Sequence, residues 1–400
     1  MRVLFLTNFY PPYEIGGQEH SCYQVVEGLR SKGHETLVLT SMHGTGNTPV
    51  EADGICRWLY LEMDLTPLKN SLTFFTERKA RERTNLQRLQ SLLERFDPHV
   101  VFIWGMWNIP WSVPLMAENS PPAQVLYRFA EHWPTLPSQY EMYWRTPGNG
   151  FAGRALKAVL GRVALGMLAG EPQRQTLKFE NAYCVSEATR DVLVEKGIPV
   201  AHAPIIHTGL DAGPYLTGRE TDRGTAGGAL RLLYAGRLTA NKGIATAIRA
   251  LGRLSKSDPS AGINLTIAGS GSAAYKDELK ALARELGVYD RVHFAGLIPQ
   301  PEMPAFLQKY DVLLVPSVWQ EPFARAVLEG MAAGMVVIAS RIGGAREIII
   351  DGENGFLFSP GNDEELARLI AGLTADPSAR SRLAAAGRET VLQEFGADAM

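Results

Sequence analysis

Short apolar runs alternate with longer amphipathic stretches along most of the chain, and this alternation occurs twice. In the first half, the runs 3–7 and 100–104 have the continuous apolar character of strands buried on both faces of a parallel sheet. The stretches 19–32 and 77–96 have the apolar spacing of amphipathic helices. Because parallel strands need a crossover connection, this order predicts parallel sheets with helices on both faces. Further strands of this half are expected at 36–40, 125–129 and 182–185.

The same order of strands and helices restarts at residue 230. The preceding segment, 213–228, is rich in glycine, threonine and charge and nearly free of large apolar residues, which is typical of an exposed linker. A chain of 400 residues suits two domains of about 200 residues each. We therefore expect an α/β protein with two Rossmann-like domains, 1–212 and 230–400, joined by a linker at 213–229, with parallel sheets facing an interdomain cleft. The strands of the second domain are expected at 232–235, 265–268, 292–295, 312–315 and 336–339.

Composition excludes several classes of function. The net charge of -2 offers no concentrated basic surface, so no nucleic-acid partner is expected. Cys22, Cys56 and Cys184 lie far apart with no CxxC, which argues against a disulfide framework or a zinc knuckle and fits a reducing compartment. The apolar run at the N-terminus is too short for a signal peptide, and no apolar stretch reaches the roughly 18 residues that span a bilayer. The expected location is cytoplasmic, with peripheral contact at the inner face of the membrane left open.

Two glycines follow the first predicted strand. Gly16 and Gly17 lie between that strand and the helix expected at 19–32. Glycine allows the backbone to approach a bound group closely, and a helix N-terminus favours an anion. The spacing is not the GxGxxG of dinucleotide-binding folds, and a plain turn is the alternative interpretation.

Two basic residues occupy the corresponding place in the second half. Arg237 follows a predicted strand, and Lys242 comes five positions later, near a helix start. Two cations and a helix dipole together would neutralise a diphosphate leaving group. Two solvated surface charges are the alternative.

The segment 316–334 is the most informative part of the chain. Pro322 suits the first turn of a helix, which would place Glu321 in the preceding loop and Glu329 about two turns inside. A carboxylate can accept hydrogen bonds from two hydroxyls, so the pair could bind the hydroxyls of a sugar and of a ribose. A diphosphate between them would face free backbone N–H groups near Phe323 and Ala324.

Several motifs in this order resemble the retaining glycosyltransferases of family GT4, also called glycosyl transferases group 1. The resemblance covers nearly the whole chain and is strongest over 230–360. It is specific to the superfamily and not to one substrate. The matching segments are GRL with KG at 236–243, the E-x7-E segment 321–329, the segments 340–347 and 351–358, and, in the first half, YPP at 10–12 with Gly16 and Gly17, and TGLD at 208–211.

This resemblance implies a GT-B fold and transfer of a sugar with retention of anomeric configuration, as in polysaccharide biosynthesis. The donor would be a UDP- or GDP-linked sugar, and the acceptor a glycan, a lipid-linked or a small-molecule hydroxyl. No cofactor is implied, and since the sequence has no DxD, no metal is expected on the diphosphate. The resemblance implies that Arg237 and Lys242 bind the diphosphate. Glu321 would contact the donor sugar beside the backbone of Phe323, Ala324 and Arg325, and Glu329 would bind the ribose. Gly16 and Gly17 would close over the phosphates, Leu297 would contact the base, and Gly269 would also contact the donor.

The chain departs from the family pattern in a few places. Many members have Gly at the position of Ala324 and Ala at the position of Gly330. Arg325 is larger than expected near a sugar pocket, and it could bind phosphate or an acidic group. Many relatives have a His-Asp pair in the first half, whereas this chain has Glu131 at the Asp position and His132 one step late. Glu321, Glu131 and His132 are the candidate catalytic residues, and a packed loop histidine is the alternative for His132.

Two other functions fit the same motifs. A nucleotide-sugar epimerase of GT-B-like fold would need acid-base groups in the cleft but no acceptor site. A non-catalytic nucleotide-sugar binding protein would need neither.

A basic amphipathic pattern occupies 151–169. It places Arg154, Lys157 and Arg162 on one face of a helix, so that this helix could lie in a membrane surface. Packing of the apolar face against the protein core is the alternative. That face carries Leu156, Val159, Leu160, Val163 and Met167.

Overall fold

The computed structural model describes residues 1–13, 16–64, 70–120, 123–148, 150–170, 177–216 and 230–396, which form two compact units. The first unit contains Met1–Val185 and Arg190–Ile205, and the second contains Ser186–Thr189 and the chain from Ile206 onward. The change of unit thus falls before the expected boundary at 212. The reason is packing, because Leu210 and Tyr215 are buried in the apolar core of the second unit. Of the expected linker 213–229, helix α8 (Gly213–Leu216) is described, and 217–229 lie outside the described residues.

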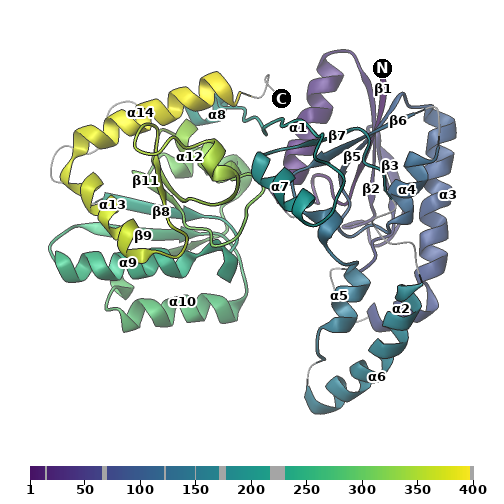
Figure 1. Ribbon diagram of the computed structural model, residues 1–400, viewed down its shortest axis with the longest axis horizontal. Helices are drawn as coiled ribbons and strands as arrows, with labels where there is room; N and C mark the ends of the chain where they lie inside the picture. The colour runs from purple at the N-terminus through teal and green to yellow at the C-terminus, as the bar shows by residue number, and fades with distance from the viewer. Residues whose placement is uncertain are drawn as a thin grey trace. The chain divides into compact units, whose positions relative to one another are not determined.

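The first unit is built on a seven-stranded sheet in the order β3-β4-β2-β1-β5-β6-β7 (Figure 1). Its strands pair in parallel, apart from the antiparallel pair β3–β4. β1 is central and aligns Leu4 with both Leu37 and Val101. The five predicted strands are present, and the β3–β4 hairpin was not predicted. The strands are β1 (Arg2–Thr7), β2 (Glu35–Ser41), β3 (Val50–Ala52), β4 (Ile55–Leu59), β5 (Val100–Gly105), β6 (Gln124–Phe129) and β7 (Ala182–Cys184).

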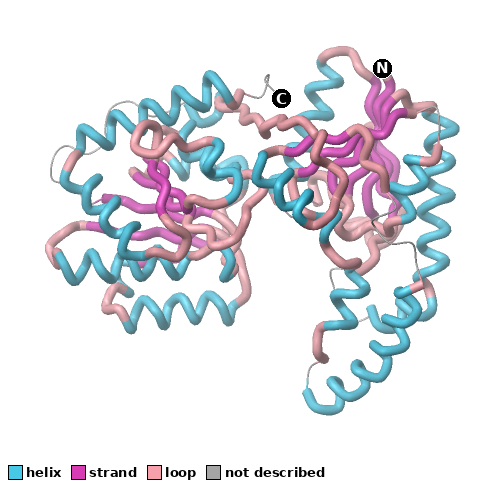
Figure 2. Tube along the Cα trace, in the orientation of Figure 1, coloured by secondary structure: helices cyan, strands magenta, loops and turns pink. Residues whose placement is uncertain are grey.

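Helices cover this sheet and extend beyond it. The predicted helices at 19–32 and 77–96 correspond to α1 and α3. Three further helices, α2, α5 and α6, meet in a separate small apolar cluster around Phe74, Tyr140 and Trp144. They form a helical extension of the first unit, which Figures 1 and 2 show leading away from its strands. The helices are α1 (Gly17–Ser31), α2 (Asn70–Thr76), α3 (Arg78–Phe96), α4 (Ser112–Glu118), η2 (Trp133–Thr135), α5 (Gln139–Arg145) and α6 (Gly150–Ala169). Helix α7 (Glu187–Glu195) has its first three residues in the second unit and the rest in the first.

The second unit contains a six-stranded, fully parallel sheet in the order β10-β9-β8-β11-β12-β13. The five predicted strands of this half are all present. The strands are β8 (Leu230–Ala235), β9 (Ile263–Ala268), β10 (Val292–Gly296), β11 (Val312–Val315), β12 (Val336–Ser340) and β13 (Phe356–Phe358).

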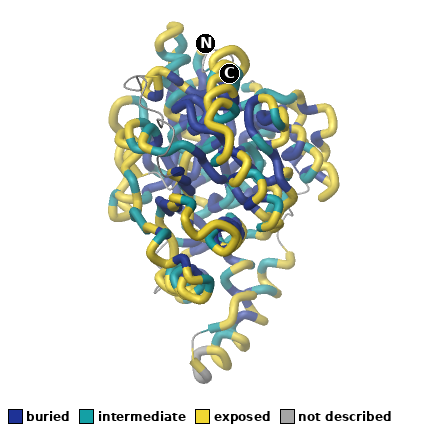
Figure 3. Tube along the Cα trace, turned by 90° about the vertical axis from the view of Figure 1, so that its left-hand side faces the viewer, coloured by how far each residue is buried: buried dark blue, intermediate teal, exposed yellow. Residues whose placement is uncertain are grey.

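Both faces of the second sheet are covered, as the alternation of strands and helices predicts. Successive residues of a strand point to opposite faces. Leu232 accordingly lies in one apolar cluster, with residues of α9, α10 and α13, and Leu233 lies in the other, with residues of α12 and α14. Figure 3 shows buried segments of the chain gathered toward the inside and exposed segments on the outside. The helices are η4 (Ala240–Lys242), α9 (Ile244–Ser257), α10 (Ala273–Glu285), η5 (Tyr289–Arg291), η6 (Gln300–Glu302), α11 (Met303–Leu307), α12 (Arg325–Ala332), η7 (Gly343–Glu347), α13 (Asp363–Ala375) and α14 (Pro377–Glu394).

Within the described part of the chain, no helix combines the length and apolar character needed to cross a membrane.

Two glycines allow the ends of β8 and β9 to touch. Gly269 has φ +139°, and a Cβ added to it would lie 1.8 Å from the carbonyl oxygen of Gly236. The N–H of Gly269 donates to the carbonyl of Gly296 at 2.7 Å, so this corner is fixed from the other side as well. The carboxyl edge of the sheet therefore has no room for a side chain here.

We predict that Gly269→Ala lowers the free energy of unfolding by roughly 2–4 kcal/mol, because the new methyl group overlaps a backbone oxygen that cannot move freely. Gly287→Ala is the matched control, since Gly287 also has a left-handed φ, +70°, but a Cβ there meets nothing within 4 Å. It should cost about 1 kcal/mol. Urea unfolding of both variants measures the difference, and equal costs would contradict the steric argument.

Candidate functional site

Two of the predicted donor-binding cations follow β8 in the second unit. Arg237 is exposed just after the strand, and its carbonyl accepts a hydrogen bond of 2.7 Å from the hydroxyl of the buried Tyr234. Lys242 ends the short helix η4. Because ligands of open parallel sheets bind at the carboxyl ends of the strands, both residues lie at the edge where a ligand is expected.

Lys242 forms an ion pair with Glu321. Its Nζ lies 2.9 Å from Glu321 Oε2, and the two side chains are 19% and 12% exposed. The hydroxyl of Ser317 donates to the other oxygen, Glu321 Oε1. Both oxygens of Glu321 therefore have a donor, so the carboxylate is held in one orientation.

The loop after β11 reaches the loop after β8 because a glycine leaves space between them. A Cβ on Gly243 would lie 1.8 Å from the carbonyl oxygen of Pro316. Beside this contact, the N–H of Val318 donates to the carbonyl of Asn241 at 2.9 Å. This backbone contact brings the segment that carries Glu321 up to Lys242.

The helix after Glu321 begins later than predicted. α12 starts at Arg325 and not at Pro322, so Glu329 lies about one turn inside the helix instead of two. The carbonyl of Glu321 accepts from the N–H of Gly344 at 2.9 Å. The hydroxyls of Ser186 and Thr189 donate to the carbonyl of Pro322, the latter at 3.3 Å. These partners lie outside the helix and keep 321–322 from joining it.

The start of α12 contains a second ion pair. Arg325 Nε lies 3.0 Å from Glu329 Oε1, and the side chains are 17% and 14% exposed. Ala324, just before the helix, is buried. Burial, and next the negative charge of Glu329, raise the pKa of Tyr215. Glu329 is therefore a partly buried hydrogen-bond acceptor beside a tyrosine that stays protonated.

Two glycines in the loop after β12 were not predicted as site residues. Gly343 has φ +62°, and a Cβ on it would lie 2.3 Å from the carbonyl oxygen of Glu321. A Cβ on Gly344 would lie 2.5 Å from the carbonyl oxygen of Pro322. The N–H of Gly343 donates to Gln320 Oε1 at 3.0 Å. The sequence signal was the Gly-Gly pair of the 340–347 segment, which supported the family resemblance but received no role.

Glu347 is another residue that sequence reasoning left without a role. Its carboxylate accepts from the N–H of Glu187 at 2.9 Å, from the N–H of Ala188 at 3.0 Å and from His207 Nε2 at 3.2 Å. Burial alone would raise the pKa of Glu347, but these three hydrogen bonds outweigh it and bring the pKa below its ordinary value. The His207 ring also stacks on Phe323, with centroids 5.4 Å apart. This network fixes Phe323 beside Glu321.

Two predicted donor-binding residues follow β9 and β10. Gly269 takes the backbone corner described above. Leu297, just after β10, is 72% exposed. An exposed leucine at the carboxyl edge of a sheet is an available apolar surface for a planar ring.

In the first unit, the predicted glycines begin α1. Gly16 has an extended backbone before the helix, and its N–H donates to Glu19 Oε2 at 2.9 Å. Gly17 is the first helical residue, and both glycines are exposed. Gln18 Nε2 donates to the carbonyl of Ala130 at 3.0 Å, which ties the helix start to the loop after β6.

That loop contains the predicted acid-base candidates, Glu131 and His132. Both side chains are partly buried. A Cβ placed on Gly105, at the end of β5, would lie 3.1 Å from Glu131 Oε1, so the carboxylate lies over the end of the neighbouring strand. Burial lowers the pKa of His132 below its ordinary value of 6.5. His132 is thus neutral at pH 7, the form in which an imidazole can accept a proton.

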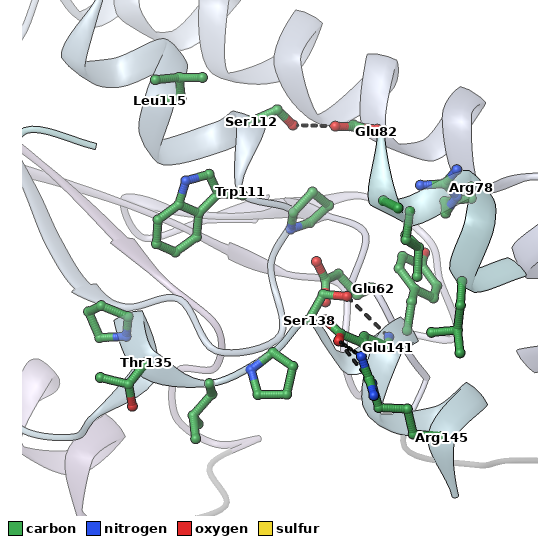
Figure 4. Close-up of a pocket in the computed structure, with 18 of the residues that line it drawn as sticks. Glu62, Arg78, Glu82, Trp111, Ser112, Leu115, Thr135, Ser138, Glu141 and Arg145 are labelled. Carbon is green, nitrogen blue, oxygen red and sulfur yellow. Dashed lines mark hydrogen bonds and ion pairs between the residues drawn. The ribbon is translucent and has the colours of Figure 1, made fainter. Parts of the chain in front are cut away.

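A cavity of about 680 Å³ opens in the first unit beside this loop (Figure 4). Its lining combines an aromatic face, Trp111, with carboxylates and cations. Ser112 Oγ lies 2.6 Å from Glu82 Oε1, and Arg145 pairs with Glu141 at 2.8 Å. The volume falls within the roughly 300–1,000 Å³ typical of small-molecule sites. The lining includes Glu62, Arg78, Glu82, Trp111, Ser112, Pro134, Thr135, Ser138, Tyr140, Glu141, Arg145, Leu165, Leu168 and Ala169.

Among the described residues, no three or more His, Cys, Asp or Glu side chains are grouped so that they could hold a metal ion. Cys22, Cys56 and Cys184 are buried free thiols.

Two protein-family models match the chain in tandem. The model of glycosyltransferase family 4 matches residues 15–213, and the model of glycosyl transferases group 1 matches residues 221–390. Between them they account for most of the chain. The chain belongs to glycosyltransferase family 4.

Individual relatives agree with this membership. A glycogen synthase of Mycobacterium tuberculosis is 34% identical over 212 residues, 53% of this chain and 49% of the relative. The lipopolysaccharide core biosynthesis glycosyltransferase LpsE of Rhizobium meliloti is 38% identical over 165 residues, 41% of this chain and 45% of the relative. The match with this chain thus spans about half the length of these curated relatives.

A solved structure of similar fold covers the whole chain. Anabaena HepE, in complex with UDP and glucose, superposes with a TM-score of 0.69 at 20% sequence identity, over 100% of this chain and 96% of that one. The predicted fold class, two Rossmann-like domains of the GT-B type, is confirmed.

We predict that Glu347→Gln lowers the free energy of unfolding by about 1–3 kcal/mol at pH 7, because the hydrogen bonds are then made to an uncharged group. The folded pKa of Glu347 lies below its ordinary value of 4.5, so its stabilisation is present above that value and is lost as the pH falls through the folded pKa. The difference between native protein and variant should therefore shrink in acid.

Denaturant unfolding between pH 3 and pH 8 measures this dependence. Glu278→Gln, on the exposed face of α10, is the matched control and should stay within about 0.5 kcal/mol of the native protein throughout. A pH-independent loss in Glu347→Gln would show that packing, not charge, carries the contribution.

Proposed function

We propose that the chain is a retaining glycosyltransferase that moves a sugar from a nucleotide-diphosphate sugar to a hydroxyl of a glycan, lipid-linked or small-molecule acceptor. The observation that carries this proposal is the Lys242–Glu321 ion pair at the carboxyl edge of the second sheet, with Arg237 exposed beside the same strand end. Family membership supports the transfer reaction. The fold shared with HepE, which was solved with UDP and glucose, supports a uridine-linked donor.

Lys242 can serve Glu321 and a phosphate at the same time. An ammonium group has three N–H donors, and the contact with Glu321 uses one. Arg237 adds a planar group that can bind a phosphate through two parallel hydrogen bonds. The two cations would hold the diphosphate, and Glu321, fixed by Lys242 and Ser317, would accept hydrogen bonds from the hydroxyls of the donor sugar.

Glu329, Leu297 and Gly269 complete the proposed donor site. Glu329 is a partly exposed acceptor at the start of α12, where it would bind the ribose hydroxyls. Leu297 would lie against the base, and Gly269 would let the nucleotide approach the backbone. Arg325, held by Glu329, would contribute its remaining N–H donors to the phosphates.

The reaction breaks the bond between the anomeric carbon and the phosphate oxygen, and the electron pair leaves with the nucleoside diphosphate. The acceptor oxygen attacks from the same face, and its proton passes to an oxygen of the departing phosphate. Positive charge develops on the sugar and negative charge on the phosphate, and fixed cations stabilise the latter. No cofactor or metal enters this scheme.

The cavity of the first unit is the acceptor site in this proposal. The buried indole of Trp111 offers an apolar contact for a sugar ring, and the paired charges of Glu141 and Arg145 offer donors and acceptors for its hydroxyls. The segment 134–138, which lines the cavity, directly follows Glu131 and His132. These two residues would orient the acceptor hydroxyl.

We predict that Lys242→Ala lowers kcat/KM by roughly 10²–10³, the usual loss when one preorganised group at a developing charge is removed. Lys256→Ala, an exposed lysine on α9, is the control and should leave turnover unchanged. The measurement is nucleotide release from UDP-, GDP- and ADP-sugars with and without a panel of acceptors, combined with NMR of the product's anomeric configuration.

Each outcome has a distinct meaning. Full turnover in Lys242→Ala would refute the diphosphate assignment, and an inverted product would refute retention. Isomerised sugar without transfer would identify an epimerase. A thermal shift with donor but no turnover of any kind would identify a binding protein.

We predict that the double variant Glu141→Ala, Arg145→Ala raises the KM for acceptor roughly tenfold, since it removes charge-assisted hydrogen bonds from the cavity wall. The KM for donor should not change, because neither residue is among those proposed to bind the donor. Arg95→Ala on α3, paired with Glu51 outside the cavity, is the control. An equal change in the KM for donor would argue against an acceptor site here.

A further inference from the structure

The helix α6 presents a row of apolar side chains to solvent. Leu156, Val159, Val163 and Met167 are 64%, 64%, 56% and 47% exposed. Their spacing of three or four residues places them along one face of the helix, and we call this row the α6 stripe. Single exposed apolar residues are ordinary, but a row on one helix is the pattern of an interaction surface.

The α6 stripe is not part of the protein core. The helix packs on the cluster around Phe74 and Trp144 through a different face, which contains Leu160, Ala164 and Leu168. Core packing, the alternative interpretation of the sequence, therefore applies to Leu160 but not to the α6 stripe. In Figure 3 the helical extension at the bottom is largely exposed.

The charge of α6 is of one sign. The helix carries Arg154, Lys157 and Arg162, and no acidic residue occurs from 150 to 169. Arg154 and Arg162 are exposed, whereas Lys157 Nζ lies 3.9 Å from the centre of the Tyr143 ring. An apolar row with exposed arginines on the same helix matches a surface that is apolar inside and negatively charged outside.

A second copy of the chain fits this surface less well. A symmetric contact brings the same patch of both copies together, so the arginines of both copies would enter one interface without acidic partners on the helix. A bilayer with anionic head groups supplies both the apolar layer and the opposite charge.

We propose that α6 docks this chain on an anionic membrane surface. The α6 stripe lies in the boundary between head groups and acyl chains, and Arg154 and Arg162 contact lipid phosphates. The helix lies in the plane of the membrane. This docking does not depend on the chemistry proposed for the second unit.

Docking also bears on the acceptor, and this consequence rests on the proposed function. Leu165, Leu168 and Ala169, in the last turns of α6, line the cavity assigned to the acceptor. At 100° per residue these three positions lie on the side of α6 away from the α6 stripe, so a helix that lies in the membrane plane places the cavity about one helix diameter, roughly 10 Å, from the lipid surface. An acceptor with a lipid anchor and a polar head is the class that reaches both.

The test is flotation of the full chain with vesicles of phosphatidylcholine alone and with added phosphatidylglycerol. We expect the native chain to float with the anionic vesicles and to be released by salt. The triple variant Leu156→Ser, Val159→Ser, Val163→Ser should abolish flotation, because it removes most of the α6 stripe. The double variant Arg154→Gln, Arg162→Gln should weaken binding to anionic vesicles by roughly thirtyfold, because each basic residue near an anionic surface contributes about 1 kcal/mol to binding.

Controls separate docking from folding and from transfer. Leu392→Ser, an exposed leucine on α14, should float like the native chain. Circular dichroism and thermal unfolding should match for all variants. The proposal is overturned if the native chain is absent from the anionic lipid fraction. It is also overturned if the native chain is a dimer that the triple serine variant dissociates, because the α6 stripe would then bind a second copy. Nucleotide release with water-soluble acceptors reports on the transferase independently, so either proposal can fail alone.

Discussion

The ion pair between Lys242 and Glu321 is the contact on which the carboxyl edge of the second sheet depends. Neither partner would keep its position alone, because an unpaired, largely buried charge is unfavourable. The pair forms because the loops after β8, β11 and β12 approach to backbone contact. Gly243 and Gly343 make that approach possible, since each has a left-handed φ and a carbonyl oxygen where a side chain would otherwise lie. The charge arrangement is thus a consequence of backbone packing at the edge of the sheet.

The same edge explains why α12 begins where it does. The carbonyls of Glu321 and Pro322 accept hydrogen bonds from Gly344 and from Ser186 and Thr189, so they are not available to a helix. The helix starts at Arg325 instead, which brings Glu329 a turn closer to the helix mouth. A shorter helix leaves Arg325 and Glu329 paired at its first turn.

Much of the fold could be predicted from the sequence, because apolar periodicity reports on burial strand by strand. The parallel strands and the helices α1 and α3 follow from it. The hairpin β3–β4 was missed although Asp53-Gly54, both with positive φ, is a recognised turn signal; its strands are short, and β3 is fully exposed, so periodicity is weak there. Glu347 and its partners were missed for another reason. Its hydrogen bonds join residues more than a hundred positions apart, and no local spacing encodes such a contact.

The helix α6 shows the limit of periodicity most clearly. Its apolar residues occupy more than one face: one packs on α2 and α5, its last turns line the cavity, and the α6 stripe remains outside. A helix that is apolar on most sides is buried in a large core or lies against something else. Two short neighbours can cover only part of such a helix, so the sequence leaves apolar surface that the first unit itself does not bury. The basic residues and the lack of acidic ones on the same helix then decide what kind of surface can cover it.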